Sequence, residues 1–216
     1  MIELRALAAL LSYPRAEMRA ALPEIADAIR RSPLIASRER AGLDALVAEL
    51  AAGDLMEAQE RYVDLFDRSR ATSLNLFEHL YGESRDRGEA MIDLKRVYAR
   101  AGFELTTSEL PDYLPVLLEY LSCRDVREAR AMLADCAHIL RSIATALIAR
   151  GSAYAAVLQA TLAIAGEAPV DAASVPRRTE PMESLDQDWP EKPAFADVPL
   201  TAMSGSQHGR DPGSTV

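Results

Sequence analysis

Residues 132–151 read MLADCAHILRSIATALIARG, and apolar side chains recur along them every three or four positions. This spacing places those side chains on one face of an α-helix, which completes a turn about every 3.6 residues. Gly151, which follows the last apolar position, is typical of a helix C-terminus. The stretch therefore predicts the longest amphipathic face in the chain, made of Met132, Cys136, Ile139, Leu140, Ile143 and Leu147.

The same spacing continues on both sides of this stretch and predicts helix after helix. Pro14 should end the first helix, and Pro23 should break or kink the second. Gly53 should end the third, Asp54 should cap the next, and Pro111 should open the helix over residues 111–121. No segment favours a strand, so residues 1–166 are expected to form an all-α domain of helices joined by short turns.

The composition suits one globular domain. The chain has 216 residues, of which 49% are hydrophobic and 26% charged, enough to build a sizeable core. Its formal net charge of −9 argues against nucleic acid or anionic lipid as the main ligand, because both attract cationic surfaces. A basic partner is the better electrostatic match.

Cysteine usage and hydropathy indicate the cellular compartment in which the protein is expected to work. The two cysteines, Cys123 and Cys136, form no C-x-x-C pair for zinc or thiol exchange. The first residues lack the features of a secretory signal, and no apolar run reaches the roughly 18 residues needed to cross a bilayer. We expect a cytoplasmic protein with reduced thiols and no direct membrane insertion.

Composition changes after Gly166. Seven of the twelve prolines lie beyond it, together with nine acidic and four basic residues, and no periodic pattern is sustained. Residues 167–216 are therefore expected to form a Pro-rich acidic tail that is mostly disordered. Trp189, the only tryptophan, is either a weak docking element in this tail or a solvated linker residue, and the second reading is favoured.

The sequence offers little material for a metal site. Asp86, Glu89 and Asp93 share one helix face, but a helical di-metal site uses two Glu-x-x-His pairs. The nearest equivalent in this chain is Asp135-x-x-His138. We favour an acidic face paired with neighbouring arginines, and we expect no bound metal.

Nucleophilic catalysis is no better supported. There is no G-x-S-x-G elbow, the chain has only three histidines, and both cysteines occupy apolar or boundary positions. No glycine-rich loop follows a strand to cradle phosphate. We expect a protein that is not an enzyme and has no catalytic residues.

The remaining hypothesis is a peptide-binding groove. Short helices that carry aromatic and acidic side chains can hold an amphipathic peptide. Some of these residues have a second reading, because periodicity alone places Phe77 and Leu117 in the core more often than at a binding surface. Asp112 could instead stabilise the dipole of its own helix. The candidate walls are Leu76, Phe77, Tyr81, Tyr113, Leu117 and Tyr120, the acidic rim is Glu78, Asp112 and Glu119, and His79 completes the set.

Four motifs resemble the NarJ family of molybdenum-cofactor assembly chaperones, the delta subunits of respiratory nitrate reductase. The motifs are LLSYP at residues 10–14, RYVDLFDR at 61–68, SLNLFEHLYGESRDRGEAMIDL at 73–94 and ELPDYLPVLLEYL at 109–121. The resemblance covers roughly residues 4–165, and the tail adds nothing to it.

The resemblance implies the all-helical fold of TorD-type maturation proteins and a chaperone role. Such a chaperone binds the apo catalytic subunit of nitrate reductase, including an N-terminal remnant of a twin-arginine leader. It permits insertion of the molybdopterin guanine dinucleotide cofactor, which it does not itself retain, and it restrains membrane docking. In the wider superfamily a Pro-Asp-His element is associated with leader binding. Pro111 and Asp112 match this element, whereas Tyr113 stands in place of its histidine. Binding that depends on protonation of an imidazole at this position is therefore not expected.

Three alternatives stay open at this point. A chaperone for another molybdoenzyme, of the dimethyl sulfoxide or trimethylamine oxide reductase type, would share the fold. A helical metalloprotein or a general adaptor belongs to a different class. The run from Glu78 to Arg85 favours the nitrate reductase branch.

Overall fold

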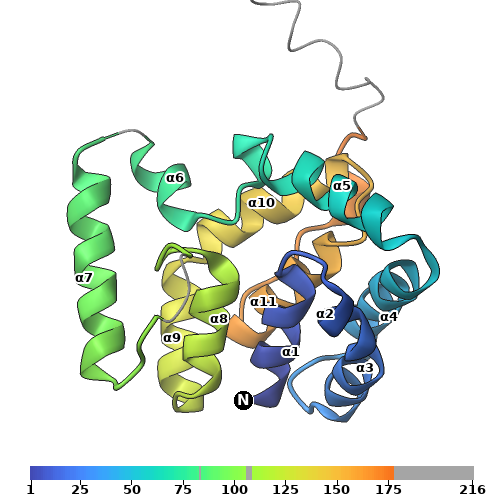
Figure 1. Cartoon of the computed structure of the whole chain (residues 1–216), viewed down its shortest axis with the longest axis horizontal. Helices are drawn as coiled ribbons and strands as arrows, with labels where there is room; N and C mark the ends of the chain where they lie inside the picture. Colours follow the sequence, from blue (N-terminus) through green and yellow to red (C-terminus); the bar gives the residue numbers. More distant parts are fainter. Residues whose placement is uncertain (83, 106–108, 178–216) are drawn as a thin grey trace, which may run out of the picture. The chain divides into compact units, whose positions relative to one another are not determined.

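The computed structural model describes residues 1–82, 84–105 and 109–177. Within them the prediction of an all-α fold is confirmed, because the strand-like pairing is limited to one isolated antiparallel bridge between Asn75 and Tyr113. Figure 1 shows the arrangement of the helices. They are α1 (Ile2–Leu11), α2 (Ala16–Ala20), α3 (Leu22–Arg31), α4 (Ser37–Ala52), α5 (Leu55–Phe66), α6 (Leu76–Tyr81), α7 (Asp86–Arg100), α8 (Leu114–Ser122), α9 (Val126–Asp135), α10 (Ala137–Ala149) and α11 (Ala155–Ala165), with single 3-10 turns η1 (Arg70–Thr72) and η2 (Ala172–Ser174).

The core is organised around α1 and α11. Both helices are apolar on most of their circumference, which is typical of helices buried on several sides. α1 packs against α3, α8 and α11, and α11 also packs against α4, α9 and α10 (Figure 1). The first and last helices of the domain therefore meet in its interior, and the others are laid around them.

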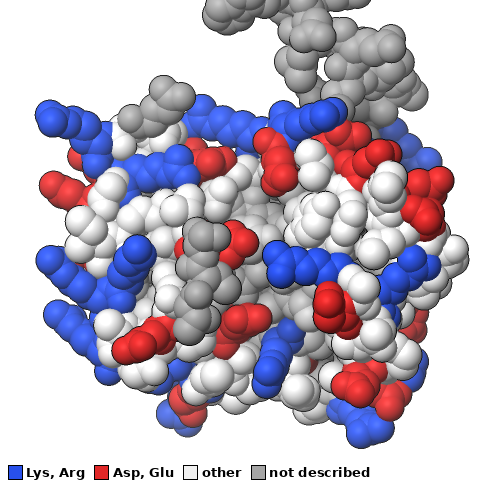
Figure 2. Space-filling view, viewed as in Figure 1, with Lys and Arg blue, Asp and Glu red and all other residues white. Residues whose placement is uncertain are grey.

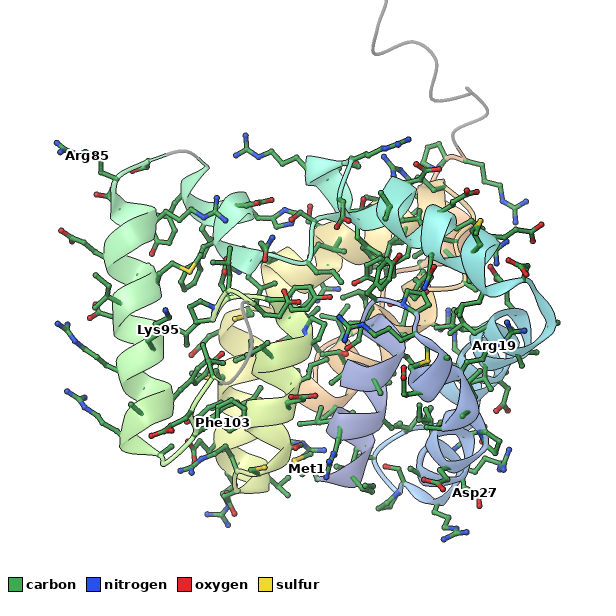
Figure 3. All side chains as sticks on the ribbon, in the orientation of Figure 1. Met1, Arg19, Asp27, Arg85, Lys95 and Phe103 are labelled. Atoms are coloured by element: carbon green, nitrogen blue, oxygen red, sulfur yellow. The ribbon has the colours of Figure 1, made fainter. Side chains whose placement is uncertain are left out.

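The predicted breaks before α3 and α5 are confirmed. Pro23 lies in the first turn of α3, directly after the short helix α2. Arg19 of α2 donates to the carbonyl oxygens of Ala51, at 2.7 Å, and Gly53, which ties α2 to the end of α4 (Figure 3). Asp54 caps α5 by accepting a hydrogen bond from the Met56 amide at 2.7 Å.

The prediction of one continuous helical face through residues 132–147 is wrong. The helix breaks at Cys136, and α9 and α10 are bent by 67° relative to each other. Both helices pack against α11, which has only 11 residues and is about 16 Å long. A straight helix through both segments would extend beyond this partner, whereas the bend keeps both apolar faces on it.

The start of α8 also differs from the prediction. The helix begins at Leu114 with Pro115 in its first turn, not at Pro111. Residues 112–114 instead form backbone hydrogen bonds with residues 74–76, around the bridge between Asn75 and Tyr113. Proline still occupies the first helical turn, as its missing amide allows, but it is Pro115, four residues after Pro111.

The described chain continues beyond the predicted boundary at residue 166, and residues after it contact the helices. The side chain of Gln159 donates to the Val170 carbonyl oxygen at 2.7 Å and accepts from the Val170 amide at 2.8 Å. Arg141 pairs with Glu167 at 3.1 Å. Part of the segment 167–177 is therefore held against α10 and α11, whereas residues 178–216, with Trp189, lie outside the described residues.

Hydropathy along the described part of the chain yields no single helix that is both long and apolar enough to span a membrane. Only α9 and α10 taken together reach that length, and they are bent at Cys136.

Gly42 provides a test of the packing between α4 and α11. A Cβ atom at this position would lie 2.9 Å from the Cβ of Ala156. We expect Gly42→Val to lower the free energy of unfolding by about 1–3 kcal/mol, because the two helices must separate. Urea unfolding followed by circular dichroism measures the change.

The matched control is Gly88→Ala on α7, where an added Cβ meets no atom within 4 Å. It should leave stability unchanged or raise it by up to about 1 kcal/mol. A Gly42→Val protein as stable as the wild type would contradict the close contact between α4 and α11.

Candidate functional site

Backbone hydrogen bonds join the motif at residues 73–94 to the motif at residues 109–121. The Leu76 amide donates to the Asp112 carbonyl oxygen at 3.1 Å, and the Leu114 amide donates to the Leu74 carbonyl oxygen at 2.8 Å. These hydrogen bonds form the antiparallel bridge between Asn75 and Tyr113. The structure therefore brings together the α6 and α8 halves of the predicted site.

Asp112 is the buried anchor of this junction. Its side chain is fully buried, and its Oδ2 accepts a hydrogen bond from the Phe77 amide at 2.9 Å, in the first turn of α6. Its Oδ1 is buried without a hydrogen-bond partner among the described residues. Asp112 therefore caps α6, a neighbouring helix, and both earlier readings (acidic rim, dipole of its own helix) are corrected.

The surroundings of Asp112 disfavour its charge. Burial raises the pKa of the Asp112 carboxyl above its ordinary value, although the Phe77 amide and the nearby Arg87 guanidinium act in the opposite direction. Glu78 adds to the increase by like-charge repulsion. The Asp112 carboxyl thus keeps its hydrogen bond to the Phe77 amide although burial disfavours its ionised form.

The raised pKa predicts a pH dependence. The unfolded chain loses the Asp112 proton near its ordinary pKa of about 3.9, whereas the folded chain loses it at higher pH. Ionisation therefore favours the unfolded state, and stability is lost as pH rises through the folded pKa. Relative to Asp112→Asn, which keeps an acceptor for the Phe77 amide, the wild type should be most stable below pH of about 4.

Urea unfolding of both proteins between acid and neutral pH tests this expectation. Asp44→Asn, an exposed substitution on α4, measures the background effect of removing a carboxylate. A constant stability difference between wild type and Asp112→Asn over the whole range would contradict the raised pKa.

Tyr113 belongs to a hydrogen-bonded aromatic cluster. Its hydroxyl lies 2.6 Å from the hydroxyl of Tyr62, which also donates to the Leu11 carbonyl oxygen at 2.7 Å. Tyr13 packs edge-on against the Tyr62 ring, with centroids 5.6 Å apart. Burial raises the pKa of Tyr113 to about 12 and that of Tyr62 further, so both phenols stay neutral near pH 7.

Three predicted wall residues are not available at the surface. Leu76, Leu117 and Tyr120 are 2%, 3% and 2% exposed and belong to the core. Tyr120 packs on the ring of Tyr98 and on Phe103, which Figure 3 labels on the segment after α7. Their burial contradicts their assignment as groove walls, and the competing reading of Leu117 as a core residue is the correct one.

The remaining predicted residues of α6 lie on a separate part of the surface. Phe77 and Tyr81 form an edge-to-face pair with centroids 5.6 Å apart. Glu78 pairs with Arg87 at 3.3 Å. His79 is half-buried and donates from Nε2 to the Ser73 carbonyl oxygen at 2.9 Å, so its imidazole has a structural partner.

An apolar groove lies between the end of α1, α2 and the start of α8. It has a volume of about 460 Å³, within the range of ligand and peptide pockets. Its apolar walls are Tyr13, Met18, Tyr113, Pro115 and Val116. We call it the α1–α8 groove.

Acidic side chains border the α1–α8 groove. Glu17, Glu109 and Glu119 line it, against a single basic residue, Arg15. Uncharged surface flanked by charged side chains is visible in the middle of the face in Figure 2. The groove thus combines apolar walls with a negative rim, a pattern suited to a basic amphipathic segment.

Tyr113 and Glu119 are site residues predicted from the sequence, whereas the opposite wall of the groove was not predicted. Tyr13, on this wall, lies in the LLSYP motif at residues 10–14. Pro115 and Val116 lie in the motif at residues 109–121. Attention to exposed aromatic residues at motif ends would have found Tyr13.

The candidate metal ligands do not converge. Within residues 1–82, 84–105 and 109–177, no group of three His, Cys, Asp or Glu side chains is placed to hold an ion. Asp93 pairs with Arg96 at 2.9 Å, as expected for a charged helix face. Figure 2 shows basic side chains along the left edge of the molecule, over α7.

Comparison with known proteins decides the family. The profile of the family described as "Nitrate reductase delta subunit" matches residues 12–160. The chain belongs to this family. The matched range of the delta subunit family contains every residue that lines the α1–α8 groove.

Three relatives show the breadth of the delta subunit family. The nitrate reductase molybdenum cofactor assembly chaperone NarJ of Escherichia coli (strain K12) is 40% identical over 205 residues, 91% of this chain and 86% of that protein. The probable chaperone NarW of the same strain is 38% identical over 159 residues, 70% and 68% of the two chains. The probable NarJ of Bacillus subtilis (strain 168) is 35% identical over 163 residues, 75% and 87% of the two chains. All three are named as assembly chaperones, and the resemblance drawn from the motifs is confirmed.

Proposed function

We propose that this chain is a NarJ-type chaperone that assists molybdenum cofactor assembly in nitrate reductase and is not an enzyme. Membership of the delta subunit family and the names of its relatives support this proposal. The cofactor, molybdopterin guanine dinucleotide, is inserted into the partner and is not retained by the chaperone. The partner is the apo catalytic subunit.

The α1–α8 groove is the proposed contact for the N-terminal segment of that subunit, a remnant of a twin-arginine leader. The observation that carries this assignment is the combination of Tyr13, Met18 and Tyr113 walls with Glu17 and Glu119 at the rim. Burial of the segment's apolar face would supply most of the affinity, at about 25 cal/mol per Å² of apolar surface. The acidic rim would orient the segment and speed its encounter.

Tyr113 fits this role as a neutral hydrogen-bonded phenol. Its hydroxyl is held by Tyr62, so the exposed part of its ring is fixed in one orientation without cost at the moment of binding. Phe77, Glu78, His79 and Tyr81 stay predicted contacts on the α6 side of the bridge and are not part of the groove.

Binding of the N-terminal segment would also delay membrane docking. A segment held in the groove is unavailable to the membrane components of nitrate reductase until the chaperone leaves. We place this step in the cytoplasm, before the catalytic subunit joins its membrane partners.

The proposal is tested with the full chain and two kinds of partner. The chain should co-purify with apo catalytic subunit and less with subunit that already contains cofactor. Calorimetric titration should detect binding of the subunit's N-terminal peptide, with weaker or no binding of leader peptides from dimethyl sulfoxide or trimethylamine oxide reductase.

Three results would contradict the proposal at different levels. Normal cofactor content of nitrate reductase in cells that lack this chain and any paralogue would overturn the chaperone function. Co-purification with the apo subunit but no affinity for its N-terminal peptide would leave the chaperone function and overturn the groove assignment. Preferential binding of the other leader peptides would reassign the chaperone to another molybdoenzyme.

A further inference from the structure

A second pocket, rich in arginine, lies where the end of α5, the turn η1, α6 and the first turn of α7 meet. Its volume is about 400 Å³, and its walls include Arg68, Arg70 and Arg87 together with Ser69 and Ser73. We propose that this arginine pocket binds the diphosphate group of a small molecule. None of its residues lines the α1–α8 groove, so the inference does not depend on the proposed function.

A hydrogen bond to a backbone carbonyl oxygen holds the Arg70 side chain at the pocket. Its Nη2 donates to the Glu78 carbonyl oxygen at 3.1 Å, near the C-terminus of α6. Gly82, at φ +56°, lets the guanidinium approach, because a Cβ there would lie 2.9 Å from Nη2. One of the five guanidinium N–H groups is used by this carbonyl oxygen, which leaves donors for a ligand.

Arg87 enters the pocket from the first turn of α7. Its Nη2 pairs with Glu78 at 3.3 Å, and its side chain is 25% exposed. Its Nε is buried and has no hydrogen-bond partner among the described residues. A buried N–H without an acceptor is costly, so Arg87 carries an unused donor in a side chain that lines the pocket.

Charge in this region is opposite to that of the whole chain. Among the described residues, the lining contains three arginines against two carboxylates, Asp67 and Glu78, in a chain of net charge −9. Arg150 adds a fourth cation beside it, because its Nη2 donates to Ser69 Oγ at 2.6 Å. Figure 2 shows basic side chains along the upper edge, over the segment that joins α5 to α6.

The geometry favours a diphosphate over a single carboxylate. Three arginines line the pocket, Arg68 and Arg70 from the connection that follows α5 and Arg87 from α7, and planar guanidinium forks match the oxygens of phosphoryl groups. The volume lies within the range of about 300–1,000 Å³ found for small-molecule sites. A free diphosphate and the diphosphate of a nucleotide share this chemistry.

Calorimetric titration of the full chain at constant ionic strength tests the proposal. The probes are inorganic pyrophosphate, ADP and adenosine. Pyrophosphate and ADP should bind, and adenosine should not. Tighter binding of ADP than of pyrophosphate would assign the site to nucleotides, whereas equal affinities would assign it to the diphosphate alone.

Variants locate the binding. Arg68→Gln and Arg70→Gln should each weaken binding about tenfold or more, because each removes a charge-assisted donor. Arg68 is mostly exposed and pairs with Asp64, so its variant should fold even if loss of the α6 contact impairs Arg70→Gln. The matched control, Arg96→Gln, removes an equally exposed arginine of α7 and should bind as the wild type does.

Three results would overturn the proposal. One is the absence of pyrophosphate and ADP binding to folded wild-type protein at millimolar concentration. A second is unchanged affinity in both Arg68→Gln and folded Arg70→Gln. The third is equal weakening by Arg96→Gln, which would show a response to total charge and not to the pocket.

Discussion

Leu117→Glu is expected to remove most of the stability of the fold. Leu117 is 3% exposed in α8, which packs on α1 at the centre of the domain. Loss of a buried leucine costs about 2–5 kcal/mol, and burial of an unpaired carboxylate adds several more. Since natural domains are stable by only about 5–15 kcal/mol, the variant should be largely unfolded at 37 °C.

Circular dichroism and urea unfolding measure this effect. The control is Glu119→Gln, two residues along the same helix and exposed, which should change stability by less than about 0.5 kcal/mol. A Leu117→Glu protein that unfolds at the same urea concentration as the wild type would show that Leu117 is accessible, and would restore it as a groove wall.

Reversal of the rim charge is expected to have the largest effect on peptide binding. In the double variant Glu17→Lys and Glu119→Lys, two attractive interactions with a basic peptide become repulsive. Each exposed pair contributes up to about 1 kcal/mol, so the dissociation constant should rise about tenfold to thirtyfold at low salt. Added salt should reduce the difference, since it screens exposed charges beyond about 10 Å at 0.1 M.

The matched control has the same net charge. Glu24→Lys on α3 and Asp44→Lys on α4 alter two exposed carboxylates that do not line the groove. Calorimetric titration of both double variants with the basic peptide separates local from global charge. If both variants lose the same affinity, net charge and not the groove rim governs binding.

Local signals in the sequence were sufficient for most of the helices. Apolar spacing located α1, α3 and α11, and the breaks at Pro23 and Asp54 follow from the missing amide of proline and the capping oxygen of aspartate. Such signals act within a few residues, so helices that depend on them can be predicted without knowledge of the tertiary structure. The bend at Cys136 places both α9 and α10 against α11, a helix that follows later in the chain, and apolar periodicity does not predict it.

The candidate site was less predictable, for a related reason. α8 is apolar around most of its circumference, so periodicity cannot say whether Leu117 or Val116 faces a groove. Tyr13 lines the same groove as Tyr113 because α1 packs beside α8, about a hundred residues later in the chain. The role of Asp112 as a cap of α6 likewise depends on a tertiary contact.

The bridge between Asn75 and Tyr113 has a consequence for how this family can vary in length. The chain between Leu76 and Asp112 makes an excursion whose two ends meet at this bridge, and within it Tyr98 is the one residue of α7 that is buried. The ends of this excursion are fixed by hydrogen bonds whatever its contour. Insertions or deletions within it would resize an appendage at small entropic cost and leave the register of α1, α8 and α11 intact.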